Sequence, residues 1–519
     1  MNPKLNNKKT GKVFLIGVGP GDIGLLTLRG KWALQQSDII IYDSLINSEI
    51  LNFAPKNSKL IFRGYRGENH ALSQHQLNFL LIKYAKKGYS VSRLKGGDPF
   101  ILGRGGEEAE YLKKFDIPFE VIPGVSSVVG VPAYAGIPLT HRDYSDSFLV
   151  ISAVKRSREF NSAILSESIL KYKGTIVILM GFYFLKEICE GLIHIGKNSK
   201  TPIAVIQNGT FASQKIVIGS LEDISQKVKN NKIQPPIIII IGDVVRLSEK
   251  MNWIKNKPLF GKRILITRDS NQNQDIRLKL VQLGAEVVEI PMIEILPLPV
   301  KKEFNEMIQH IQKYPIIIFS SSNGVELFFE KILEKKQDAR VLHNSKIICV
   351  GTATEKRLKS FGVIADWIPE KFNQNGVLKY FENNNFKNDE ILMIGAKNHR
   401  EDLVKSLNKI KIKVKYFPIY KTSFPRSSAP KIEMLFKRNE SIDLIVFFSP
   451  SAVEGFFSHL PHGRYPIKKI KFAVVGPTTL EKLKQYTSNV PICSLTATTD
   501  SLIYEIQKYF NEYSLNFIK

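Results

Sequence analysis

The residues best suited to chemistry near the start of the chain stand in a glycine turn. A short aliphatic stretch leads into Gly17-Val18-Gly19-Pro20-Gly21-Asp22, then a helical pattern and the stretch DIIIYD, which ends at Asp43. A glycine turn followed by an acid is also the fingerprint of dinucleotide binding. Against that interpretation, Asp22 occupies the third glycine position, where a carboxylate would repel a pyrophosphate, and Pro20 lacks an amide donor. Alone, the turn leaves both interpretations open.

Further glycine-rich stretches follow the first turn. They are RLKGGDPF (93–100), GRGGEE (103–108), IPGVSS (122–127) and AYAGIPLTHR (133–142). Taken singly, glycines in such loops are most simply explained as turns. Together and in this order, the stretches from about Val13 to Leu247 resemble the tetrapyrrole methylase family, in particular its uroporphyrinogen-III C-methyltransferase branch.

The resemblance implies two α/β lobes that enclose S-adenosylmethionine. Glycines would let backbone amides and carbonyls approach the cofactor closely, and Asp98 can offset cationic charge. For Met180, the alternative to a cofactor contact is packing in the core. The cofactor contacts implied by the resemblance are Pro20, Gly96, Gly97, Asp98, Ile101, Ser126, Ser127, Met180 and Gly209.

The implied reaction is transfer of methyl groups to C2 and C7 of uroporphyrinogen III, which gives precorrin-2. Proximity and orientation would supply most of the catalysis. Asp43 falls at the family position proposed to accept a proton, with a structural cap as the alternative. Tyr65 stands where the family usually has a proton-donating Lys, and a phenol can also donate. Arg66 is retained and can pair with substrate carboxylates.

In the second half, aliphatic stretches run into Ser/Thr/Gly-rich turns that open helical patterns, at 320–324, 351–354, 449–452 and 476–479. Helix N-termini present free amides and bind anions. Capping explains any single turn more simply, whereas four of them predict a cleft for a ligand with many carboxylates. The candidate carboxylate ligands are Ser321, Ser322, Thr352, Thr354, Ser449, Ser451, Thr478 and Thr479.

From about Phe260 to Tyr509 the chain resembles uroporphyrinogen-III synthase. The pieces that carry the resemblance are ILITR, FSSSNGV, VGTATEKRLKSFG, IYKT, FFSPSAVEGF, VVGPTTLEKL and Thr498. The resemblance implies a hydro-lyase that closes hydroxymethylbilane to uroporphyrinogen III, with inversion of the last pyrrole ring and no metal or cofactor. Tyr420 would help the hydroxyl leave as a proton donor, or would simply pack.

The elements that must position these residues are short aliphatic strands alternating with helical patterns, which predicts an α/β fold throughout. The second half contains an internal duplication. SSNGVELFF matches SPSAVEGFF, ICVGTATEKRLKSFG matches FAVVGPTTLEKLKQY, and the stretch from Ile264 to Ile295 resembles that from Ile391 to Thr422. Three pairs in the same circular order predict two similar lobes that face one another.

A polar stretch from Ser248 to Lys262 is predicted to link two independently folding halves. The chain is expected to divide into a two-lobed tetrapyrrole methylase fold and a bilobal synthase fold. The methyltransferase takes residues 11–247, the linker 248–262, and the synthase 263–517, with lobes 263–295 plus 423–517 and 297–422.

Composition fits an ordinary globular protein, with 43% hydrophobic and 24% charged residues among 519. The three cysteines have no CxxC spacing and the histidines no ligand spacing, so neither disulfides nor a metal site is expected. The longest aliphatic run, Ile237 to Ile241, is too short to cross a membrane. A cytoplasmic protein with no membrane partner is therefore expected.

The net charge of +26 raises the alternative of nucleic-acid binding. The excess is Lys-rich and is not concentrated in one block, so no nucleic-acid partner is expected. Polycarboxylate tetrapyrroles explain the sign equally well, and the resemblance implies a homodimer through the methyltransferase half. Two rival functions remain: an NAD-dependent oxidoreductase in the first half, and a non-enzymatic ligand-binding or regulatory module in the second.

Overall fold

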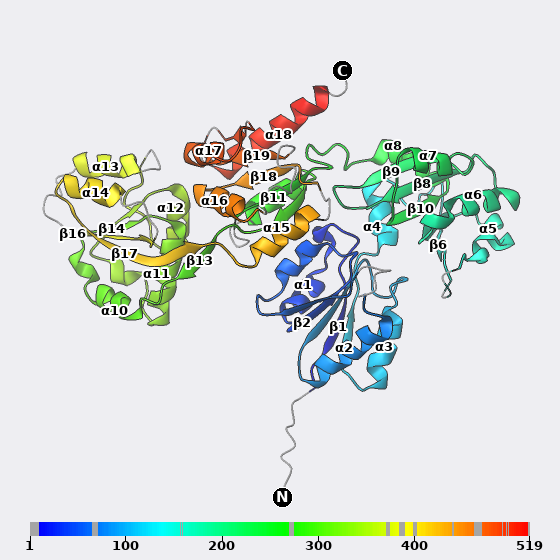
Figure 1. Cartoon of the computed structure of the whole chain (residues 1–519), viewed down its shortest axis with the longest axis horizontal. Helices are drawn as coiled ribbons and strands as arrows, with labels where there is room; N and C mark the ends of the chain where they lie inside the picture. Colours follow the sequence, from blue (N-terminus) through cyan, green and yellow to red (C-terminus); the bar gives the residue numbers. More distant parts are fainter. Residues whose placement is uncertain are drawn as a thin grey trace, which may run out of the picture.

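The structure, a computed structural model, describes residues 10–64, 71–155, 157, 159–268, 274–369, 374–383, 390–397, 402–437, 441–460, 470–489, 491–494, 496 and 498–516. Within them, strands form four five-stranded sheets flanked by helices (Figure 1). The predicted α/β class is confirmed. Aliphatic runs such as Val13–Gly17 and Ile237–Ile241 are wholly buried, as expected for strands covered on both faces.

The first sheet is parallel throughout and has the order β3-β2-β4-β1-β5. Because parallel strands end at the same edge, the loops that follow them gather there. Its strands are β1 (Val13–Gly17), β2 (Ile39–Tyr42), β3 (Lys59–Phe62), β4 (Val91–Lys95) and β5 (Phe119–Ile122). The helices of this part are η1 (Ile23–Leu25), α1 (Leu28–Gln35), η2 (Ser48–Phe53), α2 (Gln74–Lys86), α3 (Gly105–Lys114) and α4 (Ser127–Tyr134).

The second sheet is mixed and has the order β6-β7-β10-β8-β9. Its strands are β6 (Phe148–Ser152), β7 (Thr175–Leu179), β8 (Pro202–Gln207), β9 (Lys215–Ser220) and β10 (Ile237–Ile241). The helices are η3 (Ser162–Leu165), α5 (Glu167–Lys171), η4 (Phe182–Phe184), α6 (Leu185–His194), α7 (Ile224–Asn230), η5 (Asp243–Leu247) and α8 (Ser248–Met251). In Figure 1, α4 lies between the first and second sheets.

The third sheet, in the centre of Figure 1, has the order β12-β11-β18-β19-β20 and is parallel. Its strands are β11 (Arg263–Ile266), β12 (Glu286–Glu289), β18 (Leu444–Phe447), β19 (Lys471–Val474) and β20 (Ile492–Cys493). The helices are α9 (Gln274–Gln282), α15 (Ser428–Lys437), α16 (Pro450–Ser458), α17 (Pro477–Lys484) and α18 (Thr499–Asn516).

The fourth sheet has the order β13-β17-β16-β14-β15, in which β13 is an antiparallel edge strand. Its strands are β13 (Glu294–Pro297), β14 (Ile316–Phe319), β15 (Lys346–Cys349), β16 (Glu390–Ala396) and β17 (Lys413–Ser423). The helices are α10 (Lys301–Gln309), η7 (Ile311–Lys313), α11 (Ser322–Glu334), η8 (Ala339–Leu342), α12 (Thr352–Lys359), α13 (Gln374–Asn383) and α14 (Asp402–Lys409).

The duplicated sequence segments form matching parts of the third and fourth sheets. Strands β12, β11, β18 and β19 correspond to β17, β16, β14 and β15, and both sets stand in that order. In Figure 1, α12 and α16 lie on the sides of their lobes that face each other. The turns singled out in the sequence open α11, α12, α16 and α17.

The segment from Ser248 to Lys262 packs against both halves. It begins with α8 and buries Ile254 and Leu259, and the latter joins the core beside Ile264 of β11. The indole Nε1 of Trp253 donates a 3.0 Å hydrogen bond to the carbonyl oxygen of Ala133, in α4. This segment therefore fastens the second half of the chain to the first.

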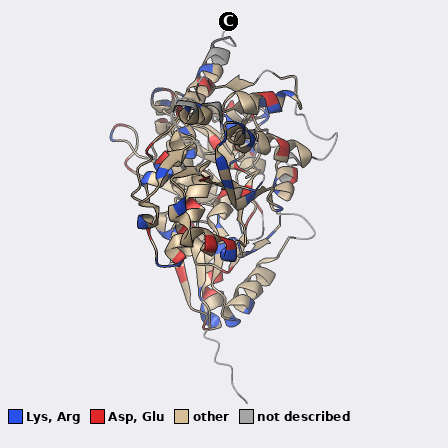
Figure 2. Cartoon of the chain, turned by 90° about the vertical axis from the view of Figure 1, so that its left-hand side faces the viewer, with Lys and Arg blue, Asp and Glu red and all other residues tan. Residues whose placement is uncertain are grey.

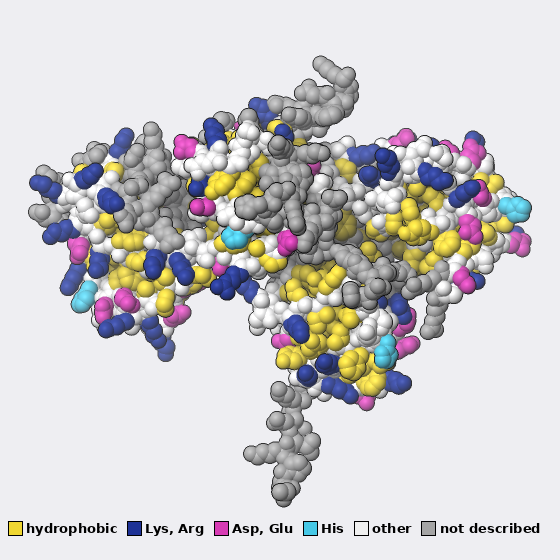
Figure 3. All heavy atoms as spheres, in the orientation of Figure 1, with side chains coloured by type: hydrophobic (Ala, Val, Ile, Leu, Met, Phe, Trp, Pro, Cys, Tyr) yellow, Lys and Arg dark blue, Asp and Glu magenta, His cyan; other side chains and the backbone are white. Residues whose placement is uncertain are grey.

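The surface carries its charges in small, mixed groups. Lys and Arg are interspersed with Asp and Glu along the chain in Figure 2, and in Figure 3 the basic side chains are spread over the visible face. Among the described residues, no helix is both long and apolar enough to span a membrane.

Candidate active sites

Three loops cross tightly at the carboxyl edge of the first sheet. Gly19 and Gly97 exchange backbone hydrogen bonds of 2.8 and 3.2 Å, which join the loops after β1 and β4. Gly97 has φ +68°, a conformation that favours glycine. A side chain on Gly124, in the loop after β5, would approach the Gly97 carbonyl oxygen to 2.4 Å. These glycines are therefore required for the loops to meet, and they leave backbone groups at the edge.

Asp98 fixes this crossing with its side chain. One carboxylate oxygen accepts a 2.8 Å bond from the Phe100 amide, and the other accepts a 3.0 Å bond from the Gly124 amide. The loop after β5 then runs into α4, whose N-cap is Ser126, and the Ser126 hydroxyl accepts from the Val128 amide at 3.3 Å. The predicted residues Gly97, Asp98, Ser126 and Ser127 therefore lie together.

The remaining predicted cofactor contacts lie around this crossing or in the second lobe. Pro20 lies against Gly130 of α4, and Gly96 lies beside Leu45. Ile101 follows in the same loop as Asp98 and is 48% exposed. Met180, directly after β7, is 39% exposed and has φ 59°. An exposed side chain on strained backbone does not fit simple core packing.

Gly209 belongs to a turn after β8 that contacts the first lobe. Its neighbours Asn208 and Thr210 both have positive φ, at 47° and 73°. The Asp22 amide donates a 2.9 Å bond to the Thr210 hydroxyl, and the Tyr134 hydroxyl donates a 2.7 Å bond to the Asp22 carboxylate. The loop that carries Pro20 and the turn that carries Gly209 are therefore held together.

Asp43, at the end of β2, is paired with a buried guanidinium. Both carboxylate oxygens accept bonds from Arg93 Nη2, at 2.8 and 2.7 Å, and Arg63 Nη1 lies 3.4 Å away. Burial alone would raise the pKa of Asp43, but the charges of Arg93, Lys95 and Arg63 and the Arg93 hydrogen bond lower it below its usual range. Asp43 is therefore a carboxylate at neutral pH, and its side chain remains 23% exposed.

The partner of Asp43 belongs to a larger buried ionic cluster. Glu108 of α3 is wholly buried and accepts a 2.9 Å bond from Lys95 Nζ and a 3.0 Å bond from Gln74. Arg93 Nε lies 3.4 Å from the same oxygen. Burial and the Arg93 charge lower the pKa of Lys95. Because Arg63, Arg93 and Lys95 face two carboxylates, the cluster carries an excess of positive charge beside a site predicted to take a polycarboxylate.

This cluster was not singled out in the sequence. Arg93 and Lys95 stand two residues apart on the wholly buried strand β4, so both lie on one face of it. Two cations on a buried central strand require buried anionic partners, which is the signal that points to Glu108. Tyr65 and Arg66 lie outside the described residues.

In the second half, Tyr420 lies against the turn that opens α11. Its hydroxyl is 2.9 Å from the Ser321 hydroxyl, which also accepts a 3.1 Å bond from the Gly324 amide. Ser449 caps α16 in the same way, accepting from the Ala452 amide at 3.2 Å. Tyr420 is 6% exposed, and burial raises its pKa, so the phenol keeps its proton at neutral pH.

The other candidate ligands of these turns differ in accessibility. Thr352, Ser451 and Thr478 are exposed and Ser322 is half-buried. Thr354 and Thr479 are only 5% and 2% exposed, so these two side chains face the interior and not the space outside the turns. The structure therefore brings Ser321 and Tyr420 together, and offers Thr352, Ser451 and Thr478 at the surface.

Comparison with known families agrees with the two-part arrangement. Residues 12–225 match the family of Tetrapyrrole (Corrin/Porphyrin) Methylases, and residues 274–504 match the family Uroporphyrinogen-III synthase HemD. The chain belongs to both families, as a fusion of a tetrapyrrole methylase and a HemD synthase, which defines a bifunctional enzyme of tetrapyrrole biosynthesis.

Relatives of the chain include the Porphyrin biosynthesis protein HemD of Ruminiclostridium josui. It is 37% identical over 493 residues, covering 95% of this chain and 97% of the relative. The Uroporphyrinogen-III C-methyltransferase of Bacillus subtilis (strain 168) is 37% identical over 356 residues, covering 69% of this chain and 73% of that protein. Among solved structures, the Uroporphyrin-III C-methyl transferase of Thermus thermophilus complexed with S-adenyl homocysteine is 31% identical. The match covers 46% of this chain and 100% of the Thermus thermophilus chain, with a TM-score of 0.40.

Proposed function

We propose that the chain carries out two consecutive steps: closure of hydroxymethylbilane to uroporphyrinogen III, and its methylation at C2 and C7 by S-adenosylmethionine. The observation that carries the proposal is the presence of both families in one chain. We assign residues 11–247 to the methyltransferase, 248–262 to the linker and 263–517 to the synthase.

The crossing of glycine loops suits the methyl donor. A side chain at Gly97 would come within 3.3 Å of the Ser127 amide, so only glycine leaves this backbone open to a ligand. Asp98 places a carboxyl group at the crossing, which suits a sulfonium or ammonium group. S-adenosylmethionine supplies an electrophilic methyl group there. The loops after β1, β4 and β5 and the Gly209 turn would bind and orient the donor, so that most of the rate comes from positioning.

Asp43 and the surrounding cations would act on the tetrapyrrole. The carboxylate of Asp43 is ionised and partly exposed, so it can accept a proton released from the ring. Its lowered pKa makes it a weak base, and its negative charge near a developing cation is an equally direct contribution. Arg63 is 25% exposed beside it and can pair with a substrate carboxylate, as proposed for Arg66. Tyr65 remains our proposed proton donor.

For the synthase reaction, the neutral Tyr420 phenol would protonate the departing hydroxyl of hydroxymethylbilane. Loss of water leaves a cation on the methylene of the pyrrole that carried the hydroxyl. Bond formation to the pyrrole at the other end of the chain, with inversion of that last ring and loss of one proton, closes the macrocycle. The N-termini of α11, α12, α16 and α17 would bind the carboxylates of the substrate through their free amides. We propose no cofactor for this half.

Two measurements test the methylase and synthase parts of the proposal separately. Equilibrium binding should show affinity for S-adenosylhomocysteine and none for NAD, since Asp22 and Pro20 disfavour a dinucleotide. Synthase assays should yield the type-III isomer, whereas spontaneous closure gives type I. NAD binding, or type-I product alone, would refute the corresponding half of the proposal.

A further inference from the structure

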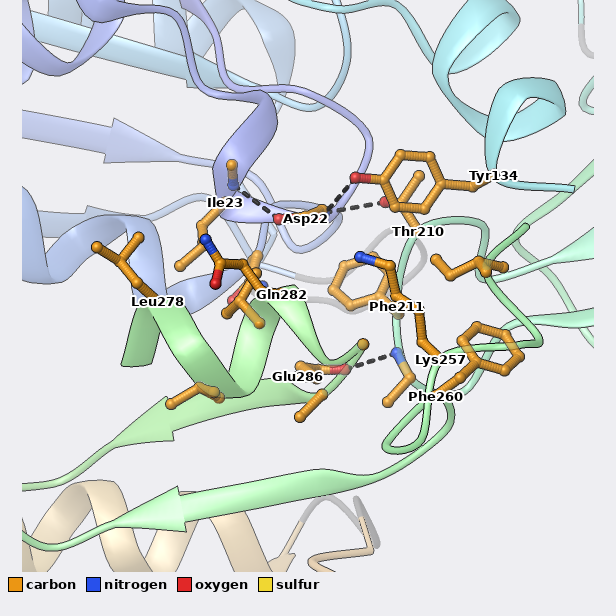
Figure 4. Close-up of a pocket in the computed structure, with 18 of the residues that line it drawn as sticks. Asp22, Ile23, Tyr134, Thr210, Phe211, Lys257, Phe260, Leu278, Gln282 and Glu286 are labelled. Carbon is orange, nitrogen blue, oxygen red and sulfur yellow. Dashed lines mark hydrogen bonds between the residues drawn. The ribbon is translucent and has the colours of Figure 1, made fainter. Parts of the chain in front are cut away.

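Strand β12 of the synthase half contacts both lobes of the methylase half. At one end, the Glu286 carboxylate accepts a 2.9 Å bond from the amide of Ala212, in the second lobe (Figure 4). At the other end, the Glu289 amide donates a 2.8 Å bond to the carboxylate of Glu49, in η2 of the first lobe. A single edge strand therefore bridges the two lobes between which the proposed methyl-donor site lies.

The Ala212 contact leads directly to the proposed donor site. Ala212 follows Gly209 in the turn after β8, and within that turn the Thr210 amide donates a 2.8 Å bond to Gln214. Thr210 in turn accepts from the amide of Asp22, two residues after Pro20. Figure 4 shows the hydrogen bonds of Asp22 and of Glu286, with these two residues on opposite sides of the turn. A shift of Ala212 would therefore move both Gly209 and the Pro20 loop.

Glu286 is itself firmly held. Its other carboxylate oxygen lies 3.0 Å from Arg263 Nε, and the two side chains are 14% and 15% exposed. Arg263 is the first residue of β11, the neighbouring strand, so the pair is fixed to the core of the third sheet. The synthase fold therefore helps to fix the position of the Ala212 turn.

Packing alone does not fix the turn, because it borders a cavity. A partly open cavity of about 300 Å³ lies at the junction. It is lined by Tyr134 and Phe211 of the methylase half, Trp253 of the connecting segment, and Gln282 and Glu286 of the synthase half. A turn next to an empty volume has room to move when its hydrogen bond is lost. The Glu286 bond restrains the turn from the synthase side.

The second contact has its own supports. Asn52 donates a 3.0 Å bond to the Glu49 carboxylate and accepts a 3.0 Å bond from Lys431 of α15. The Arg277 guanidinium of α9 lies 5.4 Å from the centre of the Phe53 ring. The first lobe is therefore attached to the same sheet as the Ala212 turn, through different residues.

We propose that Glu286 is a positioning residue for methyl-donor binding, acting through the Ala212 amide, and that β12 sets the relation of the two methylase lobes. The inference rests on the proposed function of the methylase half. It means that the affinity of this half for S-adenosylmethionine depends on the docked synthase half. Because such coupling is reciprocal, donor binding must stabilise the contacts between β12 and the methylase half by the same free energy.

Four full-length variants test the proposal through S-adenosylhomocysteine affinity, measured by calorimetry. Glu286→Ala removes the acceptor, and Glu286→Asp keeps the charge beside Arg263 but cannot reach Ala212. Both should weaken binding about tenfold, within the usual range of coupling between sites. Glu286→Gln keeps an acceptor oxygen and should bind within about threefold of the wild type. The matched control, Asp500→Ala, breaks the ion pair with Lys279 in the same lobe. Neither of these two residues lines the junction cavity, and this variant should bind as the wild type does.

Hydrogen exchange separates positioning from general damage. S-adenosylhomocysteine should slow amide exchange in residues 286–289 of the wild type and of Glu286→Gln, but not of Glu286→Ala or Glu286→Asp. Equal affinity and equal protection in all variants would overturn the inference while leaving the proposed function intact. Failure of the wild type to bind S-adenosylhomocysteine would instead overturn the proposed function. Should Glu286→Ala fail to fold, the comparison of Glu286→Asp with Glu286→Gln decides the matter.

Discussion

Replacement of Asp43 by Asn tests the electrostatic account of the methylase site most closely. The substitution keeps the size and one acceptor oxygen, but removes the charge that both contacts to Arg93 depend on. Arg93 is fully buried and would be left with Glu108, whose nearest oxygen is 3.4 Å from Nε. Arg63 loses the same partner at 3.4 Å.

The magnitude follows from the burial of the two partners. Removing one partner of a fully buried ion pair costs about 3–5 kcal/mol. Asp43 is 23% exposed and Arg93 keeps its second partner, so we expect a smaller loss, about 2 kcal/mol. For a domain of this size, that loss corresponds to a fall in Tm of roughly 4–8 °C in the methylase transition.

The contribution of Asp43 to folding stability should depend on pH. Because the pKa of Asp43 is lowered on folding, its contribution to stability is present above the ordinary Asp pKa and is lost as the pH falls through the lowered value. Calorimetric unfolding should therefore show a difference between wild type and Asp43→Asn at pH 7 that shrinks at acid pH. Methyl transfer should fall by about 100-fold or more, with S-adenosylhomocysteine affinity nearly intact. An unchanged Tm at pH 7, or unchanged turnover, would refute the pairing or the catalytic role respectively.

Three further predictions concern other parts of the chain. Gly97→Ala should weaken S-adenosylhomocysteine binding about tenfold or more, because a φ of +68° strains any side chain and a methyl group would stand 3.3 Å from the Ser127 amide nitrogen. Unchanged calorimetric affinity would count against the crossing as the donor site. Tyr420→Phe should reduce type-III closure by about 100-fold while Tm changes little, whereas a packing role predicts activity within a few-fold of wild type. Burial, together with the Glu289 charge, raises the pKa of Glu49 to about 7, so protonation favours the docked contact and docking should weaken as pH rises from about 5 to about 8. Lower amide protection in residues 286–289 at the higher pH, after correction for the intrinsic base-catalysed rise in exchange rate, would show this, and Glu49→Gln should remove the change in protection.

The strands and the glycine loops could be predicted from the sequence because short local patterns of residues specify them. Runs such as VFLIG and IIIII form buried strands, and the loops after β1, β4 and β5 meet because parallel strands end at one edge. The turns at Ser321 and Ser449 do cap their helices, as the simpler explanation required, and the proximity of Ser321 to Tyr420 comes from tertiary structure.

What sequence patterns did not provide are the long-range partners. Glu108 meets Lys95 from helix α3, which packs against α2 and β5, and no local pattern specifies that contact. Glu286 and Ala212 lie 74 residues apart, in different halves. Such contacts depend on how whole layers pack, which the periodicity of one segment does not determine.

Incubation of the intact chain with hydroxymethylbilane and S-adenosylmethionine, followed by identification of the tetrapyrrole formed, tests the central claim. Precorrin-2 formed through the type-III isomer is the predicted product. Recovery of unmethylated type-I macrocycle alone would contradict both halves of the proposed function.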